Sequence, residues 1–208
     1  MGCLGSGDPN KQQIVEVCKD KSEEQQKVIK YFVAQEGCMS KNISDDEYFS
    51  MVMRKRDSMN FKAKAIGKIG LDEDQINEIP PVMFEGFVYK NAYAKQRANG
   101  QWVSSAYQVA WLFFSATQVY IYRHTFNMDD DNKKESTDEF FYRDVTSFST
   151  SSETERAHGL GDKIFDVETN KFCMVVPGDK LYVSMDGVKD SESIIQGMKQ
   201  KLREKKMQ

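Results

Sequence analysis

The stretch Leu112-Phe-Phe-Ser-Ala-Thr-Gln-Val-Tyr-Ile-Tyr122 decides the fold class that the sequence predicts. It begins with an apolar run, continues through a small turn, and ends in alternating aliphatic and aromatic residues. Strand periodicity places Val119 and Ile121 on one face of the second strand, and Tyr120 and Tyr122 on the other. Apolar side chains on both faces indicate a strand in the wall of a β-barrel or β-sandwich.

The same strand periodicity continues on either side of this hairpin. Including the hairpin, we expect strands over 82–89, 102–114, 118–126, 138–149, 163–167, 172–176 and 180–185. A polar loop over 127–137 would join two of these strands. Turns at 168–171 and 177–179 would join the last three, because proline and glycine supply the backbone angles that a turn needs.

The residues before the strands show helical periodicity instead. A first helix is expected over 11–34, with Gly37 as its stop signal. A second helix is expected over 44–69. Ser44 and Glu47 have the spacing of a capping box, in which each side chain satisfies the free backbone N–H of the other residue.

Stop signals then separate the helical residues from the strands. Gly70 ends the second helix, and Asp72 and Gln75 repeat the capping-box spacing, which predicts a short helix through Ile76. Pro80-Pro81 excludes further helix, because proline has no N–H and pushes its predecessor out of helical backbone angles. We therefore place a domain boundary there.

The chain closes with an expected helix over 191–205, capped by Asp190 or Ser191. One narrow apolar stripe runs along it, made of Ile194, Ile195, Met198 and Leu202. The expected organisation is an α+β chain: a disordered N-terminus over 1–10, a helical region over 11–80, and a β domain with its closing helix over 81–208.

Composition narrows the classes of function. The net charge of −3 argues against nucleic acid as the partner, since duplex binders carry a strong basic excess. No apolar run approaches the ~18 residues of a membrane span, and no signal peptide opens the chain, so we expect a cytoplasmic location. The cysteines lack the paired spacing of a metal or redox site, and we predict reduced thiols, no metal and no cofactor. They are Cys3, Cys18, Cys38 and Cys173.

Two segments carry a family resemblance. The hairpin over 112–122 resembles the strand-turn-strand of bacterial PH-like and GRAM domains. Glu139-Phe-Phe-Tyr-Arg-Asp-Val-Thr-Ser147 is similar to a later strand of that family, with its Tyr-x-Asp-Ile/Val-x-Ser pattern. The resemblance covers about residues 82–206. It implies an antiparallel barrel plugged by a C-terminal helix, and a binding platform without chemistry. The helix tryptophan of the eukaryotic family is missing, which leaves the subfamily open.

Some members of this family bind phosphoinositides through cations in the first hairpin. Lys90, Lys95 and Arg97 match that motif with the spacing Lys-x4-Lys-x-Arg. Three cations on a short hairpin could chelate adjacent phosphates, and the alternative is ordinary solvated charge. The basic triplet at 54–56 is expected to be a solvated face, with an anionic lipid or an acidic partner as the alternative.

The N-terminus offers a second membrane route. Gly2 fits the N-myristoylation pattern, and Cys3 is placed for palmitoylation. Stable attachment would need two acyl chains, or one chain and a basic patch. In a source without the myristoylating enzyme, Gly2 would have no such meaning.

Catalytic motifs are scarce. His158-Gly-Leu-Gly-Asp162 is the one site-like loop, and its alternative interpretation is a turn between two strands. His124 is expected in the core or at its rim. The aspartates at 129–131 invite a calcium interpretation, but an EF-hand would need glycine in place of Lys134 and glutamate in place of Phe140.

We therefore predict a noncatalytic binding or adaptor module of the PH-like type, with a protein partner bound at an exposed sheet edge or the barrel rim. The alternative is a peripheral module on an anionic membrane at its inner face, acting through the hairpin cations or the N-terminus. A hydrolase is the second alternative. The sequence does not decide the oligomeric state, nor whether the N-terminal helices dock on the β domain.

Overall fold

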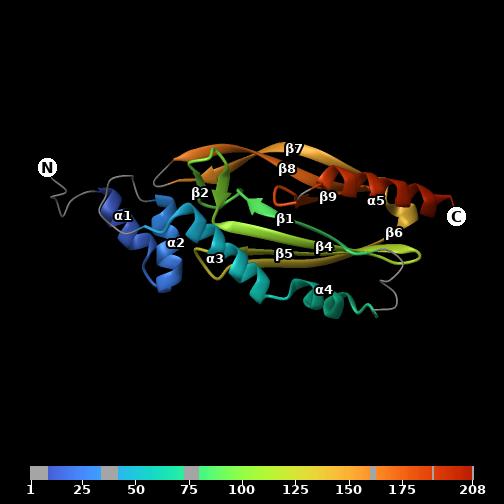
Figure 1. Cartoon of the computed structure of the whole chain (residues 1–208), viewed down its shortest axis with the longest axis horizontal. Coiled ribbons are helices and arrows are strands. Elements are labelled where there is room, and N and C mark those ends of the chain that lie inside the picture. The colour runs from blue at the N-terminus through green and yellow to red at the C-terminus, as the bar shows by residue number, and fades with distance from the viewer. Residues whose placement is uncertain (1–8, 34–41, 73–79, 160–162, 189, 208) are drawn as a thin grey trace.

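The computed structural model describes residues 9–33, 42–72, 80–159, 163–188 and 190–207. Within them, helices come first, antiparallel strands follow, and one helix closes the chain, which confirms the expected α+β order (Figure 1). The helices before the strands are α1 (Pro9–Val17), α2 (Glu23–Val33), α3 (Asp45–Ser58) and α4 (Phe61–Ile69). The closing helix is α5 (Ser191–Lys206). No helix of the described residues is long and apolar enough to cross a membrane.

The helix expected over 11–34 is two helices. Asp20, between α1 and α2, has a φ of 61°, which a continuous right-handed helix excludes. A capping box then starts α2: the Ser22 N–H donates to Gln25 Oε1 at 2.9 Å, and the Gln25 N–H donates to Ser22 Oγ at 3.2 Å. Helix α1 begins at Pro9, inside the segment expected to be disordered. Residues 1–8 and the stop signal Gly37 lie outside the described residues.

The helix expected over 44–69 is also two helices. Ser44 caps α3 as predicted, because its Oγ accepts the Glu47 N–H at 3.1 Å. Asn60 has a φ of 46° and ends that run, so α4 starts anew at Phe61. Gly70 ends α4 with a φ of 75°, as expected of a glycine cap. The short helix expected through Ile76 lies outside the described residues.

The described strands form three antiparallel sheets, with the orders β1-β4-β5-β6, β2-β3 and β7-β8-β9. The strands are β1 (Val82–Val88), β2 (Ala94–Gln96), β3 (Trp102–Ser104), β4 (Ala106–Phe114), β5 (Gln118–Asn127), β6 (Lys133–Phe141), β7 (Ser147–His158), β8 (Ile164–Val176) and β9 (Asp179–Ser184). Because the sheets stay separate, the described residues form an open sandwich and not the closed barrel that the resemblance implies.

Several strand boundaries differ from the prediction. Strand 102–114 is divided at Ser105, and strand 138–149 is divided by the short 3-10 helix η2 (Tyr142–Asp144). The loop expected over 127–137 is shorter, since β6 already begins at Lys133. Strand boundaries depend on which strands pair with each other, and the periodicity of one segment does not predict this pairing.

The turn predicted at 168–171 does not form, because these residues lie inside β8 and pair with β7. Residues 150–158, for which no strand is predicted, complete β7. Their side chains are largely exposed or half-buried, so backbone pairing more than apolar burial specifies this long hairpin. The turn at 177–179 is confirmed, with Gly178 at a φ of 85°.

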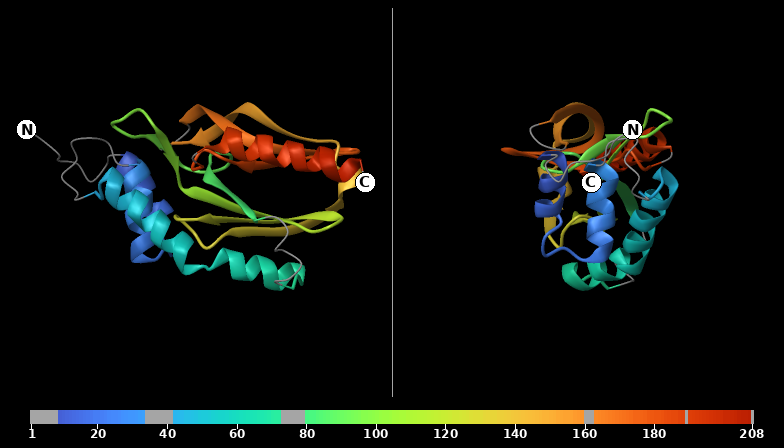
Figure 2. Two further views of the ribbon diagram at one scale, coloured as in Figure 1. Left: turned by 45° about the vertical axis from the view of Figure 1, so that its right-hand side comes forward. Right: turned by 90° about the vertical axis from the view of Figure 1, so that its left-hand side faces the viewer.

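Strands β1, β4 and β5 of the four-stranded sheet carry the buried residues, whereas β6 at its edge has none that is fully buried. Helices α3 and α4 lie on one side of this sheet, and β7–β9 with α5 lie on the other (Figures 1 and 2). The side chains that enter the helical core include Val109, Phe113, Tyr122 and Phe126. Those that face the second sheet and α5 include Leu112, Phe114, Val119 and Ile121. The prediction that the strand over 118–126 is buried on both faces is confirmed. Helices α3 and α4 cover one face, and the second sheet with α5 covers the other.

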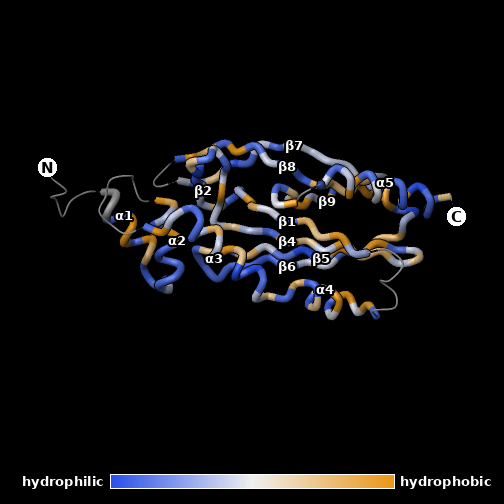
Figure 3. The backbone as a smooth tube through the Cα atoms, viewed as in Figure 1, coloured by the Kyte–Doolittle hydropathy of each residue, from blue (hydrophilic) through white to orange (hydrophobic). Residues whose placement is uncertain are grey.

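Apolar residues recur along these strands and in α4, as Figure 3 shows. Each large apolar side chain buried there contributes roughly 1.5–3 kcal/mol relative to exposure. The predicted stripe of α5 is confirmed in the second core: Ile195, Met198 and Leu202 are buried, and Ile194 is packed against them.

Polar contacts also attach the helices to the sheet. The hydroxyl of Tyr48 donates to the Ser104 carbonyl at 2.6 Å inside the core. Arg56 pairs with Glu85 at 2.6 Å, and Lys55 donates to the Asn127 carbonyl at 2.7 Å. The basic triplet at 54–56 is therefore not the solvated face that we expected, because two of its three cations contact the β domain.

Candidate functional site

The small hairpin β2–β3 carries two of the three cations that the resemblance marks for phosphate binding. Lys95 Nζ lies 3.8 Å from Asp45 Oδ1 and 4.4 Å from the centre of the Tyr31 ring. Arg97 Nη2 lies 3.0 Å from Asp46 Oδ1. Both carboxylates belong to the first turn of α3, so this helix neutralises the hairpin.

The third cation, Lys90, is exposed in the turn that precedes β2. Its side chain is in no ion pair of the described residues, while its backbone N–H donates to Glu155 Oε2 at 3.2 Å. The structure thus brings Lys95 and Arg97 to the same carboxylates and leaves Lys90 apart from them.

Asp45 is the central residue of the contact between the β2–β3 hairpin and helix α3. Burial alone would raise the pKa of its carboxyl, but a hydrogen bond from the Tyr31 hydroxyl, another from the Ala98 N–H, and the charges of Lys95 and Arg97 outweigh it. Its pKa therefore lies below the usual range. The Tyr31 hydroxyl donates to Asp45 Oδ1 at 2.7 Å, so the carboxylate links helix α2 to the hairpin as well.

Beside this contact lies a groove of about 720 Å³ between α3, β1, the β2–β3 hairpin and the segment after β9. We call it the aromatic groove. Its rings are Phe49, Phe87, Tyr89, Trp102 and Tyr107. Phe87 and Tyr107 meet edge to face with centroids 5.1 Å apart, and the Tyr89 hydroxyl donates to the Trp102 carbonyl at 3.0 Å.

Carboxylates also line the aromatic groove. Glu85 is 7% exposed; its Oε1 pairs with Arg56, and its Oε2 is buried with no hydrogen bond of ordinary geometry from the described residues, although the Tyr107 hydroxyl lies nearby. Burial raises the pKa of Asp186, and the negative charge of Glu155 adds to this effect. Burial, and then the charge of Glu85, raise the pKa of Tyr107. The groove is aromatic and carries negative charge.

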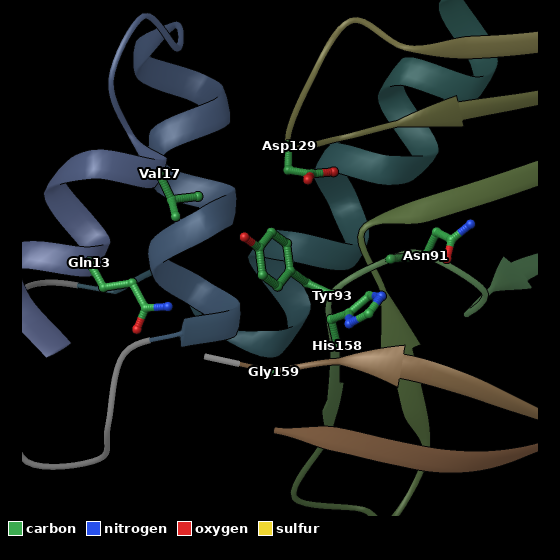
Figure 4. A pocket seen from close by; sticks show the side chains of 8 residues that line it. Gln13, Val17, Asn91, Tyr93, Asp129, His158 and Gly159 are labelled. Carbon is green, nitrogen blue, oxygen red and sulfur yellow. The ribbon is translucent and has the colours of Figure 1, made fainter. Parts of the chain in front are cut away.

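A second, smaller cavity of about 310 Å³ lies between α1 and the ends of β5 and β7 (Figure 4). Tyr93, Asp129 and His158 line it, with Gln13 and Val17 from α1 opposite them. We call it the polar pocket. It contains the first two residues of the predicted site-like loop, whose residues 160–162 lie outside the described chain.

The polar pocket holds a desolvated carboxylate. Burial raises the pKa of Asp129, and Oδ1 of this carboxylate is buried without a hydrogen-bond partner among the described residues. Burial and the charge of Asp129 raise the pKa of Tyr93. No hydrogen bond among the described residues joins the His158 imidazole to a carboxylate or hydroxyl.

His124 is a core residue. It is buried beneath α4 with its ring 5.0 Å from that of Phe61, and its Nδ1 lies 3.8 Å from a Glu135 oxygen. Burial lowers the pKa of this imidazole. Packing against α4 therefore explains why a histidine lies among aromatic residues on this strand.

The loop at 129–131 does not gather its carboxylates around one point. Asp130 accepts hydrogen bonds from Asn127 and Asn132, and Asp131 accepts one from Gln25 of α2 at 2.9 Å. Within the described residues, no group of three or more His, Cys, Asp or Glu side chains is placed to hold a metal ion.

The remaining sequence-predicted residues are placed as follows. Cys18 and Cys173 are buried free thiols. Gly2, Cys3 and Cys38 lie outside the described residues. Glu85, which no motif marks, is the functional candidate that sequence reasoning missed. A charged residue inside the otherwise apolar strand Val82–Val88 was the signal that could have found it.

Comparison of the chain with known protein families, with curated proteins and with solved structures found no match.

Proposed function

We propose that this protein is a noncatalytic interaction module of the PH-like type, which binds a segment of a partner protein in the aromatic groove. The groove is the observation that carries the proposal. It has a volume of about 720 Å³, and five aromatic rings line it. Aromatic side chains in a concave, partly desolvated patch are typical of the energetic centre of protein interfaces.

The order of elements supports the PH-like part of the proposal. Apart from the small β2–β3 hairpin, four antiparallel strands are followed by three more, and then by one amphipathic helix. That is the order which the resemblance implies. The apolar face of α5 packs into the core between the two larger sheets, as a plugging helix would.

Lipid recognition through the hairpin is the alternative, and the ion pairs of α3 weigh against it. Lys95 and Arg97 already contact Asp45 and Asp46, so a phosphate would have to displace these carboxylates. The side chains of Arg97 and Asp45 are partly buried, so their ion pair is less screened than an exposed one, and its displacement opposes phosphate binding. We rank lipid binding second for this reason.

Site-specific photo-crosslinking tests the proposal. A benzophenone amino acid at Gln101, which is exposed at the rim of the groove, is expected to form a discrete adduct with a partner in the native cytoplasm. The same amino acid at Glu139, exposed on β6, is the matched control and should give none. The Trp102→Ala variant should lose the Gln101 adduct. Equal adducts at both positions would contradict the proposal.

A hydrolase is the second candidate, and the polar pocket is the observation that favours it. His158 and the desolvated Asp129 line one cavity, which is the kind of environment that tunes acid–base groups. A screen of ester, phosphoester and amide substrates tests this candidate. An activity that both His158→Ala and Asp129→Asn abolish, with folding retained, would favour the hydrolase over the interaction module.

A further inference from the structure

We propose that the aromatic groove binds a cationic side chain, a lysine or arginine of the partner segment, with the carboxylates of Glu85 and Asp186 as its counter-ions. This inference rests on the proposed function and names the chemistry of the partner. Three features of the groove support it: the carboxylates of Asp186 and Glu168, which have no ion pair among the described residues, the buried carboxylate of Glu85, and the aromatic walls.

The charges of the groove do not cancel. Its lining cation, Arg97, is held by Asp45 and Asp46 of α3. By contrast, Asp186 and Glu168 line the groove without an ion pair among the described residues. Asp186 accepts only neutral hydrogen bonds, such as that from the Asn170 N–H at 3.2 Å. The groove is therefore left with uncompensated negative charge.

Glu85 supplies the second feature. Its side chain is 9% exposed, and Arg56 Nη1 takes only Oε1, at 2.6 Å. The buried Oε2 receives no hydrogen bond of ordinary geometry from the described residues. The Tyr107 hydroxyl lies near this carboxylate, and a ligand N–H that reached Oε2 would add a charge-assisted hydrogen bond.

The aromatic walls supply the third feature. The faces of Trp, Tyr and Phe rings attract cations within about 6 Å of the centroid. The protein already uses this contact at the rim of the groove, where the Arg97 guanidinium lies 5.8 Å from the centre of the Phe49 ring. Trp102 is half-buried and also lines the groove, whereas the Tyr89 and Tyr107 rings that line it are buried, each 3% exposed.

Other ligand chemistries fit less well. An anionic side chain would be repelled by Glu85 and Asp186, and a neutral one would bury the Asp186 carboxylate without pairing it. Arginine or lysine offers several N–H donors on one charged head and an apolar stem that packs along the rings. The occupant that the groove fits is therefore a basic segment of a protein.

Two-dimensional NMR of the full chain with ¹⁵N-labelled tryptophan tests the inference, because the chain has two tryptophans and only Trp102 lines the groove. Assignment uses Trp111→Phe. The probes are acetylated, amidated pentapeptides Gly-Ser-X-Ser-Gly in which X is arginine, lysine, glutamine or glutamate. The arginine and lysine peptides are expected to shift the Trp102 indole signal saturably and to leave Trp111 in place.

Variants and salt identify the counter-ions. Asp186→Asn should raise the Kd of the arginine peptide about tenfold, the equivalent of one charge-assisted hydrogen bond. Asp166→Asn, which removes a carboxylate exposed on β8, is the matched control and should leave it unchanged. Added salt should weaken the arginine peptide and not the glutamine peptide. Glu85→Gln is compared only if its thermal unfolding matches that of the wild type.

The outcomes separate the two proposals. If the glutamine peptide shifts Trp102 as strongly as the arginine peptide, the cation inference is wrong and the interaction groove stands. The same holds if no pentapeptide shifts Trp102 while Gln101 still crosslinks specifically. If neither peptide binding nor specific crosslinking is observed, the proposed function fails as well.

Discussion

The guanidinium of Arg56, on helix α3, lies 2.6 Å from the carboxylate of Glu85, on the edge strand β1. Glu85 is buried and the Arg56 side chain is 24% exposed, so the pair sits at the boundary between the helical layer and the sheet. A hydrogen bond from the guanidinium to Asp57 at 2.8 Å fixes the arginine further. This contact holds α3 in position beside the aromatic groove.

Loss of Arg56 should destabilise the protein. In the Arg56→Met variant, Glu85 remains buried without its cation, and we expect a loss of about 2–3 kcal/mol in unfolding free energy. This is less than for a fully buried pair, because Arg56 is partly exposed. Urea unfolding followed by circular dichroism measures it. The double variant Arg56→Met/Glu85→Gln should recover most of the loss; equal loss in both variants would contradict a charge effect.

Gly86 is expected to tolerate no side chain. A Cβ at this position would meet the Ser184 Oγ and would lie 3.1 Å from the Asp186 N, because β1 and the end of β9 approach closely. Gly86→Ala should cost about 1–3 kcal/mol, the usual range for overpacking. Denaturant unfolding measures the cost. The double variant Gly86→Ala/Ser184→Ala should be less destabilised than Gly86→Ala, since it lacks the Ser184 Oγ that the new Cβ would meet. Equal destabilisation of the two variants would show that the clash with Ser184 is not the cause.

Removal of the carboxylates of α3 should reveal whether the hairpin binds lipid. In Asp45→Ala/Asp46→Ala, Lys95 and Arg97 lose their partners and become available to phosphates. If the hairpin recognises lipid, co-sedimentation with phosphoinositide-containing vesicles should rise several-fold over the wild type and weaken with salt.

The control for this experiment is Glu23→Ala/Glu24→Ala, which makes the same change in net charge on the exposed first turn of α2. It should not raise binding. If Asp45→Ala/Asp46→Ala also fails to bind any vesicle, the described hairpin has no role in lipid recognition.

Glu135 should make stability depend on acid pH. Hydrogen bonds from Lys68 and Tyr122, at 2.8 and 2.7 Å, lower the pKa of its carboxyl from 4.5 to about 2. The ionised form is favoured by folding, so its contribution is complete above pH 4.5 and is lost as the pH falls toward 2. Glu135→Gln should therefore lower Tm at pH 7 and have little effect near pH 2.

Thermal unfolding from pH 2 to pH 7 measures this difference. Glu139→Gln, an exposed position on the same strand, is the matched control and should change Tm little at any pH. A constant difference between wild type and Glu135→Gln across the range would show that the effect is not linked to ionisation.

The features that were predicted correctly from sequence are local ones. The cap Ser44, the stop Gly70 and the turn at Gly178 depend on backbone angles and hydrogen bonds within a few residues. The alternation over 112–122 and the apolar stripe of α5 are local features too, because their periodicity predicts which side chains are buried. The helix breaks at Asp20 and Asn60 were missed, because neither residue is a strong helix breaker by itself.

Local periodicity is enough to predict the α+β order, the strands with apolar side chains on both faces, and the amphipathic closing helix, since it specifies which surfaces must be covered. It does not specify which elements cover them. Arg97 and Asp46 meet across 51 positions of the chain, and Arg56 and Glu85 across 29. Contacts of that range depend on how the layers pack. Only the packed layers bring Lys95 and Arg97 of the hairpin to the carboxylates of α3, and residues of that helix form part of the aromatic groove.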